Sequence, residues 1–559
     1  MTQKLKRNLR GTALFLVCVL FLSILPPQAD AALADNTIRV GLFYGSKALP
    51  TANLANEIGS GYEFGSFDKN GTFHAVGSTA QEKITVCKDT NLYLSGGSFY
   101  ETPTSAAYTL IGAYHLQTPG TYATYEEAAS AAAGYPYGFP AYVDGEYVVR
   151  FEFYSSSANA SADAASYAGA FVVGGSSSGY TVVNTATGAI LFEYDCGSDS
   201  YLGIMPNSGN ATLAQTWFKG YQYYGGFEYM RRSGNDLSVL NVIGEDLYVA
   251  GVLPYEFVSS GGLESLKAGA VAIRTFARVS HKHSASGFDI CNTTDCQVYR
   301  GVFTGTNADK VLQAVEETSG ECAYYNGAPI EALYFSSDGG ATEDAVNAWG
   351  GDHPYLKGKE DPYESTISFN GQSWSYQVTP AQLKDFLAGR GYSCAAIVDF
   401  AVTETTANGN VNEITITDSN GKTFVFKRDD VRILQNLPGV TYMSRRFTIA
   451  SNGGGAVSSG GTFDVYDGNT TITRDSVTAI TSKGQITVTA PAEVLTGAGT
   501  STVGGDTSPS TGNDSGWTLR GGGYGHNIGM SQWGAYAMAK LGYSYDEILK
   551  FYYTGITIR

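Results

Sequence analysis

Positively charged residues are scarce in this chain of 559 residues. Its 35 lysines and arginines are outnumbered by 52 aspartates and glutamates, which gives a formal net charge of −17. Beyond the N-terminus no run rich in lysine or arginine occurs, and both nucleic acid and anionic lipid headgroups are bound through such basic surfaces. The composition therefore argues against both ligand classes, and no nucleic-acid partner is expected.

Long apolar runs are also scarce, and the single candidate is at residues 12–25. Four basic residues precede this run, and two prolines and Ala29-Asp30-Ala31 follow it. A basic start, a short apolar core and an A-x-A site are typical of a secretory signal peptide, here residues 1–31. Cleavage after Ala31 removes four positive charges and one negative charge, so the net charge becomes −20. We expect a secreted or cell-wall protein; if the signal is not cleaved, it becomes a membrane anchor.

Charged residues make up only 16% of the chain, whereas it contains 69 glycines and 39 tyrosines. Tyrosine suits carbohydrate, because its ring covers the apolar C–H patches of a sugar while its hydroxyl forms a hydrogen bond. A β-rich protein with aromatic strands would have the same composition. Both interpretations stay open on composition alone.

The first part of the mature chain is predicted to be rich in strands. Residues 36–110 contain "TIRVGLFYG" and many Gly/Ser/Asn turns, as in a region of short strands. A strand followed by an Ala-rich helix then occurs twice, in "YHLQTPGTYATYEEAASAAAG" and "YVVRFEFYSSSANASADAASYAGA". This order predicts a small α+β module of ferredoxin-like shape at residues 111–185. The module resembles a SPOR domain, the fold that binds septal glycan strands stripped of their peptides.

Residues 210–559 form the largest predicted domain. "WFKGYQYYGGFEYMRR" and "LSVLNVIGEDLYVAGVLP" are interpreted as strands, and the apolar stripe of residues 263–280 predicts a helix. "KVLQAVEETSG" predicts another helix, and "NEITITD" and "TFVFKRDD" predict strands. Residues 451–516 are rich in Gly, Ser and Thr and predict a flexible insertion that leaves and returns at one edge of the domain.

The chain closes with "GGGYGHNIGMSQWGAYAMAKLGYSYDEILKFYYTGI". This glycine-rich stretch is no phosphate loop, because no Lys-Ser/Thr pair follows the glycines and no βαβ unit surrounds them. Ser531 is predicted to cap a helix that ends near Leu541, and Ser544 and Glu547 form a capping box for a last helix. The glycines then allow close approach of the backbone to a ligand or strand, with His526 at the turn.

This closing stretch resembles the C-terminal signature of the stage II sporulation protein D (SpoIID/LytB) family. "YVAGVLPYEFVSSGGLESLKAGAVAIRTFAR" is similar to the central signature of the same family. "FDICNTTDCQVYRG" and "EALYFSSDGGATEDAVNAWGGDHPYLKGKEDPYE" also match in order and spacing. The resemblance covers about residues 217–559 and implies an α+β fold, with a β-rich SpoIID-like catalytic domain that contains a few helices.

The resemblance implies lytic cleavage of peptidoglycan glycan at the β-1,4 bond after N-acetylmuramic acid, with a 1,6-anhydro product and no required cofactor. The acid of the family pattern corresponds to Glu256. A protonated carboxyl group donates to the leaving oxygen and then takes the proton of the sugar's own C6 hydroxyl, so that no second carboxylate is needed to activate water. The alternative is a non-catalytic glycan-binding enhancer of a cell-wall amidase. A secreted zinc hydrolase is a third hypothesis, but H-E-x-x-H is lacking.

Further residues of the family blocks are predicted to bind glycan; they are Arg274, Ser336, Ser337, Tyr524, His526, Ser531 and Gln532. Arg274 could instead brace the site, and a tight turn at Ser336 and Ser337 and a helix-surface ion pair of Arg274 remain open alternatives. The chain departs from the family pattern at Phe257, Gly269 and Asn527, which replace Met, Gln and Gly. Asn527 introduces a side chain where the family has none, although asparagine tolerates positive φ better than most residues.

Cysteine and histidine residues gather in the block after the central signature. His281 and His283 precede Cys291 and Cys296, and C-x4-C is a spacing that binds zinc. The family resemblance implies a structural zinc held near this loop by His283, Cys291 and Cys296. A disulfide between the two cysteines is the alternative, because export permits disulfides.

Overall fold

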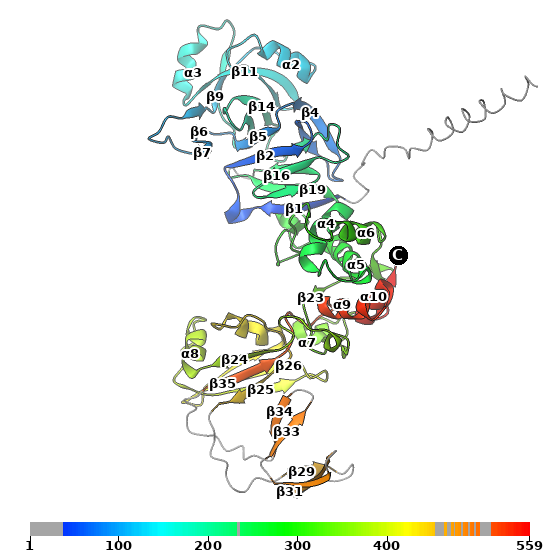
Figure 1. Cartoon of the computed structure of the whole chain (residues 1–559). Helices are drawn as coiled ribbons and strands as arrows, with labels where there is room; N and C mark the ends of the chain where they lie inside the picture. The colour runs from blue at the N-terminus through cyan, green and yellow to red at the C-terminus, as the bar shows by residue number, and fades with distance from the viewer. Residues whose placement is uncertain are drawn as a thin grey trace, which may run out of the picture. The chain divides into compact units, whose positions relative to one another are not determined.

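The computed structural model describes residues 37–231, 235–452 and 516–559, together with the backbone of six short strands between residues 463 and 503. The predicted signal peptide and most of the predicted insertion lie outside the described residues. The chain divides into two compact units, and each is described by itself (Figure 1). Unit 1 comprises residues up to 259 and residues 277–320; unit 2 comprises residues 260–276 and 321–559.

Unit 1 is rich in strands, as predicted for residues 36–110. Its strands are β1 Thr37–Phe43, β2 Thr51–Ile58, β3 Tyr62–Phe67, β4 Phe73–Thr79, β5 Lys83–Lys88, β6 Leu92–Ser95, β7 Ser98–Tyr100, β8 Thr109–Ile111, β9 Tyr114–Gln117, β10 Phe139–Val143, β11 Glu146–Tyr154, β12 Phe171–Val173, β13 Tyr180–Asn184, β14 Ile190–Asp195, β15 Leu202–Pro206, β16 Gln215–Phe218, β17 Tyr221–Tyr223, β18 Gly226–Met230, β19 Ser238–Gly244 and β20 Ile290–Cys291. Its helices are α2 Tyr125–Ala132, α3 Ser157–Ala164, α4 Glu245–Glu256 and α6 Ala308–Glu316. Helix α5, Leu263–Val279, includes residues of both units.

Two large sheets organise unit 1. One has the order β20-β1-β19-β18-β15-β3-β4, and the other has the order β12-β9-β11-β10-β14-β13-β5-β2-β16-β17. β1 therefore pairs with β19, and β2 pairs with β16. The strands on the two sides of the predicted boundary at residue 210 share both sheets. The predicted domain ranges remain predictions from the sequence.

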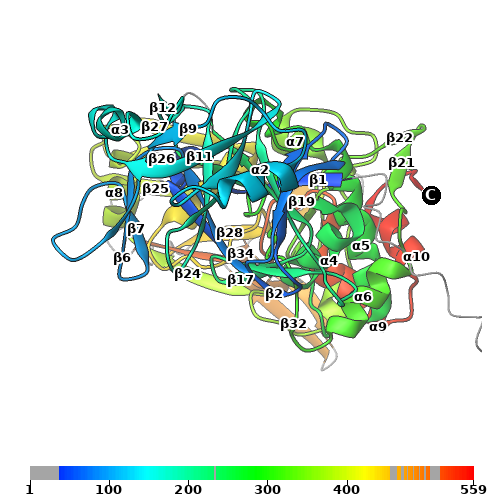
Figure 2. The same ribbon diagram turned by 90° about the horizontal axis from the view of Figure 1, so that it is seen from above.

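The predicted strand–helix repeat is confirmed. The elements follow one another as β9-α2-β10-β11-α3-β12, and the strands lie in the order β12-β9-β11-β10 with antiparallel pairing (Figure 1). Val149 packs with α2, and Phe151, two residues further along β11, packs with α3. Since alternate residues of a strand point to the same face, both helices cover one face of the sheet, as Figure 2 shows from above. This is the βαββαβ arrangement of ferredoxin-like modules.

The prediction of a strand over "GEDLYVAGVLP" was wrong, because the chain is helical there. β19 ends at Gly244, and α4 follows immediately with Glu245 and Asp246 in its first turn, where acidic side chains stabilise a helix. The run from Tyr248 to Leu253 is buried throughout. A helix buried on all sides shows no amphipathic period, and its β-branched and aromatic residues suggested a strand instead.

Unit 2 holds smaller sheets and several short helices. Its strands are β21 Ala323–Tyr325, β22 Ala328–Pro329, β23 Tyr334–Phe335, β24 Trp374–Val378, β25 Ile397–Thr405, β26 Val411–Asp418, β27 Thr423–Lys427, β28 Phe447–Ser451, β35 Trp517–Gly521, β36 Met530–Ser531 and β37 Thr557–Ile558. Its helices are α7 Ala345–Trp349, α8 Pro380–Ala388, α9 Gln532–Lys540 and α10 Tyr545–Tyr552. The sheets β24-β35-β28 and β25-β26-β27 share one core with α8.

The predicted insertion begins and ends on neighbouring strands. β28 ends at Ser451, and β35 begins at Trp517, its antiparallel partner across the sheet. Between them the backbone forms three hairpins, β29 Phe463–Tyr466 with β30 Thr471–Arg474, β31 Ser476–Thr481 with β32 Gly484–Thr489, and β33 Ala492–Thr496 with β34 Gly499–Val503. The chain thus leaves the sheet β24-β35-β28 at the end of β28 and returns to it at the adjacent start of β35.

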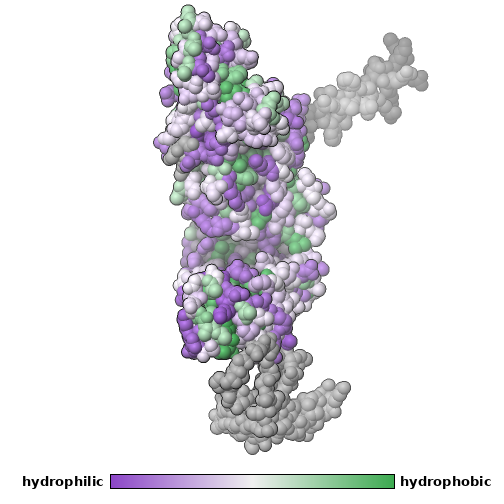
Figure 3. Space-filling model, turned by 90° about the vertical axis from the view of Figure 1, so that its left-hand side faces the viewer, coloured by the Kyte–Doolittle hydropathy of each residue, from purple (hydrophilic) through white to green (hydrophobic). Residues whose placement is uncertain are grey.

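The molecule is a mixed α+β protein, in agreement with the predicted fold class. On the face drawn in Figure 3, hydrophobic residues are interspersed with hydrophilic ones. In the part of the chain that the structure describes, no helix combines the length and the apolar character needed to cross a bilayer.

Candidate functional site

Glu256 is the last residue of α4, in unit 1, and its side chain is half-buried. The backbone N–H of Val298 donates a hydrogen bond of 2.7 Å to its Oε1. The loop that carries Val298 is itself held on α4, because Arg300 N–H donates to the carbonyl of Gly251. A Cβ at Gly251 would lie only 2.5 Å from the Tyr299 ring, so glycine lets loop and helix approach closely. The carboxyl group is thus fixed between the end of a helix and a loop.

Two exposed tyrosines belong to the same unit, and one of them, Tyr255, directly precedes Glu256 on α4. Tyr255 is 41% exposed and Tyr221 is 39% exposed. The Phe303 ring meets Tyr255 edge to face at 5.8 Å, and the Arg300 guanidinium lies 5.3 Å from the centre of the Tyr221 ring. The pKa of Tyr255 is raised, chiefly by burial and then by Tyr221. We call Tyr221, Tyr255 and Phe303 the aromatic wall; the tyrosine-rich composition suggested such a surface but not its members.

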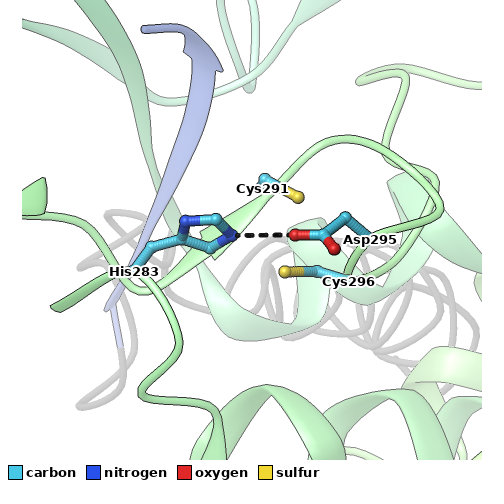
Figure 4. A group of neighbouring side chains, drawn as sticks. All are labelled: His283, Cys291, Asp295 and Cys296. Carbon is cyan, nitrogen blue, oxygen red and sulfur yellow. Dashed lines mark ion pairs between the residues drawn. The ribbon is translucent and has the colours of Figure 1, made fainter. Parts of the chain in front are cut away.

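His283, Cys291 and Cys296, the predicted metal ligands, lie together in unit 1, and Asp295 joins them (Figure 4). One ligand atom of each lies within 4.8 Å of those of the other three. Cys291 is on β20, which pairs with β1, and the His283 ring stacks on Phe288 at 4.8 Å. The positions are therefore fixed by a sheet edge and an aromatic contact. Asp295 lies inside the C-x4-C spacing, which by itself does not mark the aspartate as a ligand.

The chemistry of this donor set fits a zinc ion. Two thiols, an imidazole and a carboxylate are ligands that zinc accepts in a four-coordinate site. His283 Nε2 is buried and has no hydrogen-bond partner at a suitable distance and angle among the described residues, and its ion pair with Asp295 Oδ2 is long, at 3.6 Å. Cys296 donates a hydrogen bond to Cys291 and lowers the pKa of the Cys291 thiol to about 4, whereas the pKa of Cys296 is raised because its proton is held there. Both cysteines are free thiols, not a disulfide.

Arg274 is predicted to bind glycan or to brace the site. Its side chain is fully buried, and Nη1 donates to the carbonyl of Glu321 at 3.2 Å within unit 2. The structure therefore gives it a bracing position. Of the other predicted residues in unit 2, Tyr524 is 43% exposed, Ser336 is half-buried, and Gln532 begins α9.

Ser337 and Ser531, predicted to line a groove, are both buried. Their hydroxyls donate to the two carboxylate oxygens of Glu364, to Oε2 from Ser337 at 2.7 Å and to Oε1 from Ser531. Ser531 also caps α9 as predicted, since its Oγ accepts from Gly534 N–H at 3.1 Å. Through these hydrogen bonds to Glu364 the two hydroxyls connect segments inside unit 2, and they are not exposed to solvent. Their partner Glu364 is the last residue of the same family block as Ser337, but it was not among the predicted site residues.

His526 lies between two aromatic rings, at 5.3 Å from Phe335 and 5.4 Å from Trp349. The pKa of His526 is lowered to about 4, first because burial disfavours the charged ring and then because Arg432 repels it. Its Nδ1 accepts a hydrogen bond from Ile528 N–H at 3.1 Å, as a neutral ring can. His526 is therefore a neutral ring packed between two aromatic side chains at the turn.

Asn527 has positive φ, 63°, as the pattern of glycine at this position predicts. Its side chain is fully buried: Nδ2 donates to the carbonyls of Asp338 at 2.8 Å and Ala341 at 3.2 Å, and Oδ1 accepts from Arg445 N–H at 3.1 Å. The departure from the family pattern thus adds an internal brace rather than an obstruction in a groove.

Asn527→Ala is expected to lower the free energy of unfolding of unit 2 by about 2–4 kcal/mol, because three buried backbone groups lose their partner and alanine disfavours positive φ. Asn527→Gly relieves the backbone and is expected to cost less. Thermal and urea unfolding measure both, with the exposed Asn420→Ala as control. Equal stability of Asn527→Ala and wild type would contradict the bracing role.

Three buried carboxyl groups, of Asp338, Asp361 and Glu364, meet in unit 2. Glu364 accepts four hydrogen bonds and Asp361 accepts three, one of them from Tyr552 Oη at 2.5 Å. Asp338 Oδ1 accepts from Gly340 N–H, but no donor to Oδ2 is found in the part of the chain that the structure describes. The pKa of Asp338 is raised well above its usual range by burial and by the charges of Glu364 and Asp361.

Asp338→Asn is expected to stabilise unit 2 at neutral pH. The Asp338 carboxyl group holds its proton more tightly in the folded protein than in the unfolded chain. The free energy of unfolding of the wild type therefore falls as the pH rises from the unfolded pKa of about 3.9 towards the raised folded pKa. Asparagine does not titrate, so the variant does not lose stability in this way. The difference in free energy of unfolding between Asp338→Asn and wild type is expected to grow from pH 4 upward and to reach about 1–2 kcal/mol or more at pH 7. Unfolding at several pH values tests this, with the exposed Asp352→Asn as control. A constant or reversed difference would refute a retained proton on Asp338.

Residues 233–325, which include Glu256 and the cluster of His283, match the family model "SpoIID: Stage II sporulation protein". An amidase enhancer of Bacillus subtilis (strain 168) is 31% identical over 310 residues, which are 55% of this chain and 40% of that protein. The stage II sporulation protein D of the same bacterium is 28% identical over 57% of this chain and 76% of its own length. An uncharacterized protein of Brachyspira hyodysenteriae is 29% identical over 61% of this chain and 73% of its own length.

The chain thus covers less than half of the amidase enhancer and about three quarters of the other two relatives. The family model covers the first two of the four sequence blocks, including Glu256. Through residues 233–325 the chain belongs to the SpoIID family.

Proposed function

We propose that this protein cleaves the glycan strands of peptidoglycan as an exported lytic transglycosylase, with Glu256 as acid and base. The observation that carries the proposal is the position of Glu256, whose carboxyl group is fixed between the end of α4 and the loop of Val298, in the unit that also carries the aromatic wall. A glycan strand has apolar C–H faces that stack on such rings. The family match covers this residue and its helix.

In the proposed reaction the protonated Glu256 carboxyl group donates its proton to the glycosidic oxygen, and the bond from C1 of N-acetylmuramic acid to that oxygen breaks. The C6 hydroxyl of the same sugar forms a new bond to C1, and the Glu256 carboxylate takes the hydroxyl proton. The carboxyl group is thereby restored, and the product has a 1,6-anhydro end. Water is neither consumed nor activated, so one carboxyl group is enough.

The cluster of His283, Cys291, Asp295 and Cys296 is proposed to hold a structural zinc ion. Bound zinc there would tie β20 to the loop of Asp295 and Cys296, which precedes Val298, the hydrogen-bond donor to Glu256. Its contribution is stability of that loop, and no step of the reaction requires it.

The region of residues 111–185 is proposed to direct the enzyme to peptide-free glycan. Its βαββαβ arrangement agrees with the resemblance to a SPOR domain. Signal-directed export brings the chain to the wall, and a cell-wall amidase, which removes stem peptides, is the proposed partner.

The test is the release of 1,6-anhydromuramoyl ends from peptide-free glycan strands by the purified chain, followed by mass spectrometry. Release supports the proposal. The second candidate is a glycan-binding enhancer of an amidase, which the name of the B. subtilis relative favours. Binding without release, together with faster turnover by an added amidase, would favour the enhancer and refute the transglycosylase.

A further inference from the structure

An open groove in unit 2, whose lining includes none of the residues named around Glu256, has a volume of about 940 Å³. It lies at one end of the sheet β24-β35-β28 and is lined by Gly339, Ser373, Trp374, Ser375, Gly409, Arg446, Phe447, Thr448, Arg520, Gly521 and Gly522. Two of these residues are arginines and none is acidic, in a chain with a net charge of −17. We call it the arginine groove.

Arg520 is on the central strand of the sheet and is exposed. Its partners on the neighbouring strands are Ser375 of β24 and Thr448 of β28, so that two hydroxyls flank one guanidinium on the same face. Among the described residues, no carboxylate forms an ion pair with Arg520. The side chain is thus available to a ligand that offers a negative charge and hydroxyl groups.

Arg446 comes immediately before β28, and its guanidinium is held in place. Nη1 donates to the carbonyl of Asn408, and a Cβ at Gly409 would lie only 2.8 Å from Nη1. Glycines also form the floor at Gly521 and Gly522, where a Cβ would lie about 2.5 Å from Arg446 O and 2.6 Å from Gln372 O, respectively. Close packing of the backbone therefore requires glycine at these positions, and the lining there is backbone.

Such a groove suits an anionic saccharide. Guanidinium groups bind carboxylates through two parallel hydrogen bonds, and Ser375 and Thr448 can exchange hydrogen bonds with sugar hydroxyls. The volume is in the upper part of the range usual for small-ligand sites. A long basic surface for nucleic acid is absent from the lining, which holds two cationic side chains.

We propose that the arginine groove binds the free lactyl carboxylate of a muramoyl residue, and so recognises glycan from which the stem peptide has been removed. This inference rests on the proposed function for its substrate class. While the stem peptide is attached, the lactyl carbonyl is part of an amide and carries no charge. Hydrolysis of that amide leaves one carboxylate on each muramoyl residue, and the groove distinguishes the two states by that charge.

The test measures binding to the full-length Glu256→Gln variant, which leaves the ligand uncut. The probes are a peptide-free muramoyl oligosaccharide, the same oligosaccharide with its lactyl groups converted to neutral carboxamides, and an N-acetylglucosamine oligomer of equal length. Calorimetry at low salt is expected to give at least 10-fold tighter binding of the acid than of either neutral probe. This difference is expected to shrink in 1 M salt, which screens exposed charges.

Arg520→Gln and Arg446→Gln, each added to Glu256→Gln, are expected to weaken binding of the acid at least 10-fold and to change binding of the carboxamide less than 2-fold. Arg390→Gln, which removes a guanidinium of unit 2 outside the groove, is the matched control. Equal binding of acid and carboxamide by the parent would overturn the inference, as would equal losses for both probes. Circular dichroism and thermal unfolding confirm that each variant is folded.

The outcomes are independent of the cleavage assay. Cleavage by wild type without discrimination between the acid and the carboxamide refutes the groove and leaves the proposed function standing. Discrimination without cleavage refutes the transglycosylase and keeps the groove as a binding site. Stronger competition by inorganic phosphate than by lactate would refute the lactyl carboxylate as the ligand group.

Discussion

Glu256→Gln is expected to reduce the release of 1,6-anhydromuramoyl ends by a factor of about 10²–10⁴ or more, the usual contribution of a general acid and base. Glutamine has the same shape and keeps an oxygen that accepts from Val298 N–H, so the loop stays in place. Its amide has no acidic proton for the leaving oxygen, and it does not take the proton of the C6 hydroxyl. Mass spectrometry of products from peptide-free strands measures the change.

The loss is expected in kcat rather than in binding, because the aromatic wall is unchanged. Glu316→Gln is the matched control, since it alters an exposed carboxylate on α6 of the same unit. The thermal midpoint of Glu256→Gln is expected to stay close to that of wild type. Full activity in Glu256→Gln would show that another group donates the proton, and unfolding of the variant would be seen in the same melt.

Local signals explain the features that could be predicted from the sequence. Ser531 caps α9 and Ser544 forms a capping box with Glu547 of α10, because a cap depends only on residues three positions apart. The strand–helix repeat was visible for the same reason. Its assembly in the order β12-β9-β11-β10 follows from the usual packing of two such repeats.

Features made by distant residues could not be predicted in this way. Ser531 and Glu364, which form a hydrogen bond, are 167 positions apart in the sequence, and the residues around each give no local signal of this contact. Ser337 and Ser531 are of a residue type that is common in sugar-binding grooves, but their hydroxyls donate to a buried carboxylate instead. Pairing of β28 with β35 brings Arg520 and Arg446 into one groove. A long segment separates these two strands in the sequence, so their pairing could not be predicted from local patterns.

The cluster around His283 carries the second large expected effect. The purified chain is expected to bind one zinc ion, and Cys291→Ala or Cys296→Ala to abolish this binding, because each removes one of four ligands. Metal content by mass spectrometry of the native protein and competition with a chromogenic chelator measure the stoichiometry and affinity. Asp295→Asn is expected to weaken binding less, since its side chain is about half exposed and shared with Lys282 at 2.5 Å.

Zinc at 1,000 times its dissociation constant stabilises the folded state by about 4 kcal/mol, so chelation is expected to lower the thermal midpoint of wild type by several degrees and to leave that of Cys291→Ala unchanged. Cys196→Ala, in the same unit but outside the cluster, is the control and is expected to keep its zinc. A disulfide between Cys291 and Cys296, detected as a mass lower by two hydrogens, would refute the metal site. Cleavage that persists after chelation would make the ion structural, because the proposed proton transfers occur on Glu256 alone. Loss of cleavage with an intact fold would instead require a catalytic metal and would overturn the proposed reaction.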